Sequence, residues 1–291
     1  MTFTNPQYLV ETAWLEAHLN DPALRILDCT VLFATDADGV RAASGRDAWA
    51  EGHIPGSGFA DLMQDLSDRN SSVPFMMPPA AQFAEAMSRY GIGEDTHVVL
   101  YDACSDLWAH MWAARIWWML RVCGFEQAAV LNGGWHKWTM EGRPVSTDPS
   151  TYPPAHFVAR PRPELMADKR EVLATIGDNH TCLLNALTVE DHTGTAVRYG
   201  RAGHIPSSVN VPTAALIDPV THAYLPAAQL HAQFEVAGTL NRERVITYCG
   251  GGIAASSDAF VLTLLGAPNV AVYDGSLLEW AADPALPMET A

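Results

Sequence analysis

The sequence predicts an α/β protein made of two tandem units, each a mainly parallel sheet flanked by helices. Short β-type runs alternate with segments of helical period along the chain, a pattern typical of parallel sheets covered on both faces. The tetrapeptide Gly-His-Ile-Pro occurs at residues 52–55 and again at residues 203–206. Four identical residues in a row indicate that one structural unit has been duplicated.

Further matches follow in the same order in both halves of the chain. The run Val98–Asp102 corresponds to Val245–Cys249, so that Asp102 stands where the second copy has a cysteine. The later matching pairs are Gly124 with Gly266, Gly133 with Gly275, and Trp138 with Trp280. Between the copies, a proline-rich stretch without helical period indicates an extended linker. We expect a first domain at residues 1–143, a linker at 144–164 and a second domain at 165–291.

Composition limits the possible partners. The chain has 291 residues, of which 48% are hydrophobic, and its 17 basic against 33 acidic side chains give a formal charge of −16. This charge argues against binding to nucleic acid or to an anionic membrane surface. No apolar run reaches the roughly 18 residues of a membrane span, and the N-terminus lacks the features of a signal peptide. We therefore expect a cytoplasmic protein.

The cysteines and histidines do not form recognisable metal or disulfide patterns. The five cysteines are widely spaced and include no Cys-x-x-Cys pair, and the eleven histidines include no His-Glu-x-x-His pair. We expect reduced thiols, no metal and no cofactor. The cysteines are Cys29, Cys104, Cys123, Cys182 and Cys249.

The strongest candidate for chemistry is Cys249. It follows a β-type run, precedes three glycines, and stands before a helical segment, Ile253–Leu265, that Gly266 and Pro268 should end. Glycines allow the backbone to turn several N–H groups toward one point, where the helix dipole adds to their field. This arrangement predicts a stabilised thiolate with a low pKa, which would be nucleophilic at neutral pH. The alternative is a buried structural cysteine.

A dinucleotide-binding site is a competing interpretation of the same stretch. Gly250, Gly252 and Ala255 fit the spacing of the fingerprint Gly-x-Gly-x-x-Ala, and Asp274 ends the β-type run that follows. The context does not fit, because too few residues follow Asp274 to complete a doubly wound half.

Taken together, these motifs resemble the rhodanese family, in particular the two-domain thiosulfate and 3-mercaptopyruvate sulfurtransferases. The residues that carry the resemblance are both Gly-His-Ile-Pro motifs, Arg115–Met119, Leu131–Trp135, Tyr273–Gly275 and the Cys249 loop. The resemblance implies an inactive first domain, a catalytic second domain and an active site at their interface. It also implies that sulfane sulfur passes from a small anionic donor, through a persulfide on Cys249, to cyanide or a thiol acceptor.

The same resemblance implies which residues bind the substrate. The backbone of Gly250, Gly251, Gly252, Ile253 and Ala254 would cradle the transferred sulfur, and Arg198 or Arg201 would hold the donor's anionic group.

The choice between the two donors stays open. Thiosulfate-specific members carry a cation in the loop, which is absent here. The mercaptopyruvate type has glycine at the second loop position, but it also pairs an Asp and a His in the first domain, at places matched here by Met63 and Phe75.

Two other functions compete with catalysis by a sulfurtransferase. The first is a non-catalytic persulfide carrier or interaction module, loaded by a partner desulfurase. The second is a phosphatase of the same superfamily, which we do not expect because those enzymes use a Cys-x5-Arg loop and this chain has Ala255 at the arginine position.

Three minor expectations concern packing. The tryptophan-rich segment Leu107–Cys123 should form core or domain interface, with Trp112 either in the core or facing a cleft. His53 and His204 should fix their turns by hydrogen bonds, and Asp61 should either line the cleft or cap a turn.

Overall fold

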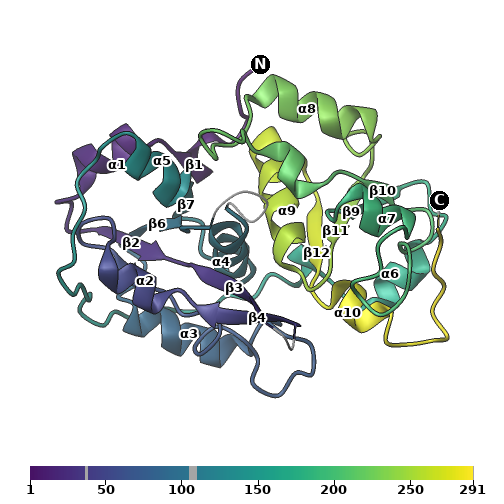
Figure 1. The fold of residues 1–291 in the computed structure, drawn as a ribbon, viewed down its shortest axis with the longest axis horizontal. Helices are drawn as coiled ribbons and strands as arrows, with labels where there is room; N and C mark the ends of the chain where they lie inside the picture. The colour runs from purple at the N-terminus through teal and green to yellow at the C-terminus, as the bar shows by residue number, and fades with distance from the viewer. Residues whose placement is uncertain (37–38, 105–109, 291) are drawn as a thin grey trace.

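The computed structural model describes residues 1–36, 39–104 and 110–290. Two five-stranded sheets form its framework, one in each half of the chain (Figure 1). In both sheets, all strand pairings among the described residues are parallel. The first sheet contains, in spatial order, β1 (Leu9–Val10), β7 (Ala128–Leu131), β6 (His97–Tyr101), β2 (Leu24–Asp28) and β5 (Gly58–Phe59). The second contains β8 (Met166–Ala167), β12 (Val270–Tyr273), β11 (Arg244–Tyr248), β9 (Thr181–Asn185) and β10 (Val209–Asn210).

The two sheets have the same connectivity, which confirms the predicted duplication. When they are compared in this order, each strand of the second has its counterpart in the first, so that β11 matches β6 and β12 matches β7. The strands that precede Asp102 and Cys249 are both central, with two neighbours each. The carboxyl ends of such strands are where ligands gather in parallel sheets.

Helices cover the sheets and come from the segments of helical period. The central helix of the first lobe is α4 (Met111–Val122), and the one that follows Cys249 is α9 (Ile253–Leu265), which ends at Gly266 with φ of 90° as predicted. The part of the predicted tryptophan-rich helix at residues 107–109 lies outside the described residues. The other helices are α1 (Thr12–His18), α2 (Arg46–Glu51), α3 (Ala80–Arg89), α5 (Gly134–Met140), α6 (Lys169–Thr175), α7 (Val189–Thr193), α8 (Ala227–Val236) and α10 (Ser276–Trp280).

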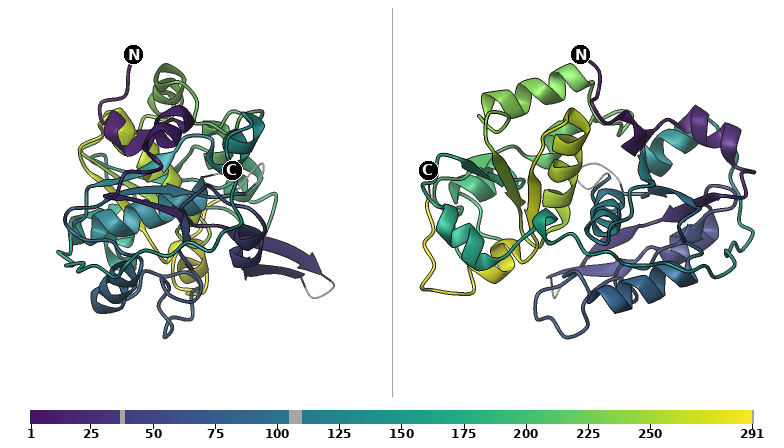
Figure 2. Two further views of the ribbon diagram at one scale, coloured as in Figure 1. Left: turned by 90° about the vertical axis from the view of Figure 1, so that its left-hand side faces the viewer. Right: turned by 180° about the vertical axis from the view of Figure 1, so that it is seen from behind.

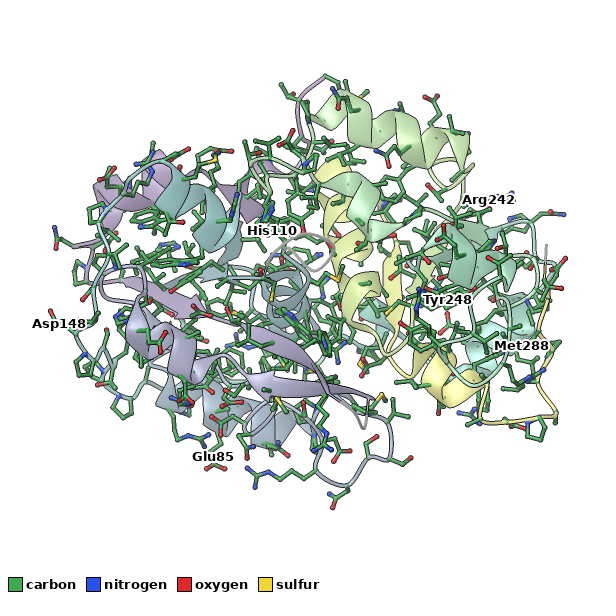
Figure 3. All side chains as sticks on the ribbon, in the orientation of Figure 1. Glu85, His110, Asp148, Arg242, Tyr248 and Met288 are labelled. Carbon is green, nitrogen blue, oxygen red and sulfur yellow. The ribbon has the colours of Figure 1, made fainter. Side chains whose placement is uncertain are left out.

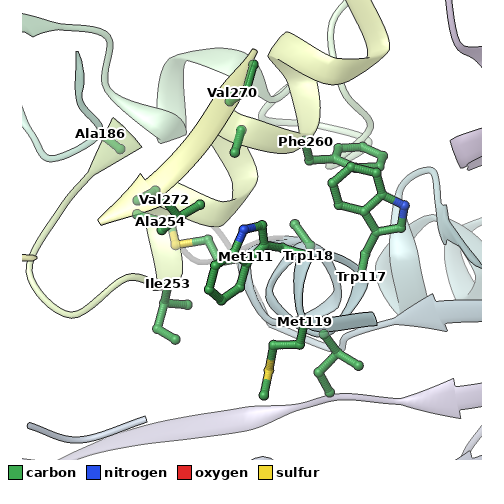
Figure 4. Close-up of a cluster of buried hydrophobic side chains, with 14 of the residues drawn as sticks. Met111, Trp117, Trp118, Met119, Ala186, Ile253, Ala254, Phe260, Val270 and Val272 are labelled. Atoms are coloured by element: carbon green, nitrogen blue, oxygen red, sulfur yellow. The ribbon is translucent and has the colours of Figure 1, made fainter. Parts of the chain in front are cut away.

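The lobes meet through α4 and α9, which lie side by side at the centre of the molecule (Figure 1). Trp117 of α4 packs edge-on against Phe260 of α9 with ring centroids 4.8 Å apart (Figure 4). One hydrophobic cluster continues from the first lobe into the second through this contact. Trp112 is fully buried, so of its two predicted positions the core is the one observed. A continuous core of this kind keeps the two domains in a fixed relation.

The first lobe carries an antiparallel hairpin, β3 (Val31–Asp36) and β4 (Gly39–Ser44), that the sequence analysis did not predict. Figure 2 shows it projecting from the body of the lobe. At the corresponding point, after β9, the second lobe has the short helix α7. The hairpin is therefore a difference between two otherwise matched units.

The proline-rich linker is bound to the surface of the first lobe. The Tyr152 hydroxyl accepts a hydrogen bond from the Ile26 N–H (2.8 Å) and donates one to the Gly56 carbonyl (2.7 Å). Ser146 forms an isolated antiparallel bridge with His53. The boundaries at residues 143 and 164 remain predictions. Across the ranges that the structure describes, no helix has both the length and the apolar character needed to cross a bilayer.

Candidate active site

The loop that contains Cys249 joins β11 to α9. Cys249 follows the last strand residue, Tyr248, and Gly252 is the N-cap of α9 with φ of 78°. Glycine adopts this left-handed conformation at low cost. The strand, turn and helix predicted around Cys249 are all present. Figure 3 places Tyr248 in the second lobe, where its hydroxyl is hydrogen-bonded to Ser208 in the turn of the second Gly-His-Ile-Pro motif.

Ser276 holds the two ends of the cysteine loop together. Its Oγ accepts hydrogen bonds from the N–H groups of Cys249 and Gly252, both 3.1 Å long, and donates one to the carbonyl of Tyr273 at 2.7 Å. Ser276 has a φ of 47°, which is uncommon for a residue with a side chain. Ser276 could not be predicted from the residues around Cys249, because its partners are distant in the chain.

The Cys249 thiol is buried, with 2% of the residue exposed. Burial raises the pKa of this thiol above its ordinary value, while four backbone N–H groups lower it, those of Ala255, Gly251, Gly252 and Ala254. Three of these amides, those of Gly251, Gly252 and Ala254, belong to the predicted cradle of residues 250–254, whereas Ala255 was not predicted. The predicted low pKa is wrong. Burying a charged sulfur removes its favourable hydration, and the peptide dipoles of the loop compensate for only part of this desolvation cost.

The raised pKa predicts how Cys249 reacts with an alkylating agent. Because the thiolate is the reactive form, the rate of labelling by iodoacetamide should increase about tenfold per pH unit from pH 7 to pH 9. Mass spectrometry of the modified peptide measures this rate. Labelling of the other thiols should be slower, because burial raises the pKa of Cys182 to about 11 and that of Cys123 to about 12. A rate for Cys249 that levels off below pH 7 would contradict the expectation.

A buried ion pair between the domains lies directly beneath the loop. Arg115 of α4 and Asp274, which follows β12, approach to 2.6 Å between Nη1 and Oδ1, with side-chain exposures of 0% and 3%. A Cβ added to Gly252 would lie 2.6 Å from the same Oδ1 and 3.1 Å from the same Nη1. The glycine at 252 is therefore required by space as well as by its φ. Asp274 is engaged by the first domain, which excludes the ribose-binding role that a dinucleotide site would need.

A segment of the first domain, residues 74–77, packs against this ion pair. The Arg115 guanidinium donates a hydrogen bond to the Phe75 carbonyl (2.7 Å), and the Met77 N–H donates one to Asp274 Oδ2 (2.7 Å). The Pro74 carbonyl oxygen lies 3.9 Å from where a Cβ on Gly251 would stand. The cysteine loop therefore lies at the interface between the domains, as the family resemblance implied.

Two positions in the first domain lack groups that could transfer protons. Phe75 packs its ring edge-on against Trp112 with centroids 5.4 Å apart, and Met63 is partly buried against the core. Neither side chain ionises, so no acid or base is supplied at these two places.

In the first lobe, a carboxylate occupies the place that corresponds to the thiol. Asp102 follows β6 and accepts hydrogen bonds from the N–H groups of His110, Trp112 and Ala113 at 3.1 to 3.2 Å. Burial raises the pKa of Asp102 to about 7, although the amides of His110 and Ala113 lower it. Figure 3 shows His110 on the side of the first lobe that faces the second.

The two candidate arginines have different surroundings. Arg198 Nη1 lies 2.7 and 2.6 Å from the two carboxylate oxygens of Asp191, and its side chain is 57% exposed. Arg201 Nη1 instead donates hydrogen bonds to the carbonyls of Asp283 (3.1 Å) and Leu286 (2.8 Å). Arg201 therefore ties the C-terminal segment to the second domain, whereas Arg198 reaches solvent.

The histidines of the two repeated motifs make the hydrogen bonds expected of them. His53 bonds to the carbonyls of Trp49 (2.8 Å) and Asp148 (3.0 Å), and His204 bonds to that of His192 (2.6 Å). Asp61 caps a turn, since its Oδ1 accepts from the N–H groups of residues 63 and 64. The described residues contain no cluster of three or more His, Cys, Asp or Glu side chains arranged to hold a metal ion.

Known proteins similar to this chain have the rhodanese-like domain or are named for sulfur transfer. A model of the rhodanese-like domain matches residues 11–141 and 177–283. A thiosulfate sulfurtransferase of Bos taurus is 34% identical over 280 residues, covering 94% of this chain and 91% of the relative. The sulfur carrier protein TtuD of Thermus thermophilus is 31% identical over 293 residues, covering 96% of this chain and 95% of that protein. The solved structure of SseA from Escherichia coli, described as a 3-mercaptopyruvate sulfotransferase with the rhodanese fold, superposes with a TM-score of 0.80 at 30% identity, covering 92% of this chain and 98% of that chain.

Proposed function

The chain belongs to the rhodanese family of sulfurtransferases, and we propose that it transfers a sulfane sulfur through a persulfide on Cys249. The observation that carries this proposal is the position of the thiol. It stands at the carboxyl end of a central strand, inside a ring of backbone N–H groups and at the interface of two domains. A nucleophile in a preorganised field of donors fits a reaction in which negative charge moves onto the atom being transferred.

In the first half-reaction, the Cys249 thiolate attacks the outer sulfur of the donor. A sulfur–sulfur bond forms, the bond between that sulfur and the rest of the donor breaks, and the leaving group departs with the electron pair. With thiosulfate the leaving group is sulfite, and no external oxidant is needed because the sulfur already has the oxidation state of a sulfane. A covalent intermediate divides one difficult transfer into two easier ones.

In the second half-reaction, the acceptor attacks the terminal sulfur of the persulfide. The Cys249 thiolate leaves with the electron pair, and cyanide becomes thiocyanate or a thiol becomes a new persulfide. A persulfide is more acidic than a thiol, so the amides of Gly250, Gly251, Gly252, Ile253 and Ala254 would hold an anionic terminal sulfur more readily than the anionic thiol. We infer that the loop is suited to the charged intermediate rather than to the resting enzyme.

We propose Arg198 as the group that binds the anionic part of the donor, because Arg201 is occupied by two carbonyl groups. Replacing Arg198 by alanine should raise the KM for thiosulfate or 3-mercaptopyruvate by about tenfold, the usual effect of losing one charge-assisted hydrogen bond. Steady-state kinetics with each donor measures this change. The matched control is Arg201→Ala, which should lower thermal stability and leave KM nearly unchanged. The opposite assignment of these two effects would contradict the proposal.

The donor itself is tested by comparing turnover with thiosulfate and with 3-mercaptopyruvate, each with cyanide as acceptor. Thiocyanate formation gives the rate, and the intact mass of the protein after donor alone should show one added sulfur atom. The proposal is overturned if neither donor adds sulfur to the protein or supports turnover.

A persulfide carrier is the second candidate function. Its support comes from the relative named as a sulfur carrier, and from Arg198, whose charge is partly neutralised by Asp191 and so attracts small anions less strongly. A carrier would accept sulfur from a partner desulfurase and give no turnover with either small donor. An enzyme would turn over without that partner.

A further inference from the structure

Tyr199 packs its ring directly against the backbone of the cysteine loop. A Cβ added to Gly250 would lie 2.1 Å from Cε1 of this ring, 2.5 Å from Cζ and 2.8 Å from the hydroxyl oxygen. These distances are far inside van der Waals contact. Gly250 does not have a positive φ, so its backbone does not require glycine. The reason for glycine at the second loop position is that the tyrosine ring occupies the space where a side chain would begin.

The hydroxyl of Tyr199 is a hydrogen-bond donor beside the cysteine loop. Burial, and then the negative charges of Cys249 and Asp191, raise the pKa of this phenol well above its ordinary value. The phenol therefore keeps its proton near neutral pH. Within the part of the chain that the structure describes, no group accepts a hydrogen bond from this hydroxyl, which leaves it available to a substrate.

We propose that Tyr199 determines substrate specificity and donates a hydrogen bond to the sulfur carried on Cys249. The proposal rests on the persulfide mechanism described above. In this arrangement the ring replaces a side chain at position 250, and the hydroxyl supplies a neutral donor where a cation could otherwise stand. A neutral donor stabilises one negative charge on the terminal sulfur but does little for a dianion. Tyr199 therefore favours donors that carry a single negative charge over the thiosulfate dianion.

The test of the hydroxyl uses the variant Tyr199→Phe, which keeps the ring and its packing. The full-length protein is mixed with 3-mercaptopyruvate or thiosulfate, and sulfur loading on Cys249 is followed by intact mass at several pH values. Loading by 3-mercaptopyruvate should slow about tenfold, the effect of losing a hydrogen bond to a charged group. The midpoint of its pH profile should move upward, because the anionic sulfur has lost a donor. An unchanged rate and pH profile would overturn the role of the hydroxyl.

The test of the ring uses Gly250→Ala alone and combined with Tyr199→Ala. In the parent protein the new methyl group would overlap the ring, so loading should fall strongly. In the Tyr199→Ala background the same methyl group no longer overlaps the ring, so its added effect should be small. If Gly250→Ala has the same effect in both backgrounds, the Tyr199 ring is not the reason for glycine at position 250. The failure of this inference is distinguishable from failure of the proposed function, since in the latter case the unmodified protein itself would take up no sulfur.

Discussion

Replacing Cys249 by serine should abolish sulfur transfer, with a fall of at least about a thousandfold in kcat/KM for either donor, as expected for loss of a covalent nucleophile. A serine hydroxyl does not ionise in this loop and forms no stable bond to sulfane sulfur. Thiocyanate formation measures the loss of turnover, and intact mass should show no added sulfur. The fold should remain, because the smaller hydroxyl fits the space of the thiol between the same N–H groups.

The matched control is Cys182→Ser, which removes another buried thiol of the same sheet, from β9. This variant should transfer sulfur at close to the normal rate. Transfer that survives in Cys249→Ser would exclude Cys249 as the residue that carries sulfur. Equal loss in both variants would show that the effect is not specific to Cys249.

Replacing Arg115 by methionine should destabilise the protein by about 3 to 5 kcal/mol, the usual cost of removing one partner of a buried ion pair. The loss leaves the Asp274 carboxylate buried without its countercharge and removes the hydrogen bond that holds the Phe75 carbonyl. Unfolding in urea, followed by tryptophan fluorescence, measures the change. Sulfur transfer should fall as well, because residues 74–77 and Gly252 both rest on this pair.

A second variant separates the charge from the packing. Adding Asp274→Asn to Arg115→Met removes the unpaired charge and should restore part of the lost stability. If the single variant unfolds at the same urea concentration as the parent protein, the ion pair does not hold the domains together. The loss of stability in the double variant is compared with the sum of the losses in Arg115→Met and Asp274→Asn. If the double variant loses more than this sum, the two groups do not stabilise each other.

Much of the architecture follows from local patterns in the sequence. The β-type run, three glycines and helical period around Cys249 predict β11, the loop and α9, and the repeated motifs predict two sheets of equal connectivity. These features depend on residues that are close in the chain. The same patterns correctly place Cys249 at the carboxyl end of a strand.

What the sequence analysis missed depends on contacts between distant residues. Ser276 on the loop, the pair of Arg115 with Asp274, and the ring of Tyr199 on Gly250 each join segments that only the complete fold brings together. The predicted direction of the Cys249 pKa shift was wrong for a related reason. Neighbouring amides can be inferred from a glycine-rich turn, but the depth of burial depends on the whole interface.

Asp102 shows that a ring of backbone amides at the end of the central strand can hold a group with no part in the proposed sulfur transfer. In each half of the protein, backbone amides face one electron-rich side chain, a carboxylate in the first and a thiol in the second. The donors belong to the main chain, so their positions follow from the fold and not from particular side chains. Under the proposed mechanism, the residue placed among these amides decides whether a given copy supports the fold or reacts with sulfur.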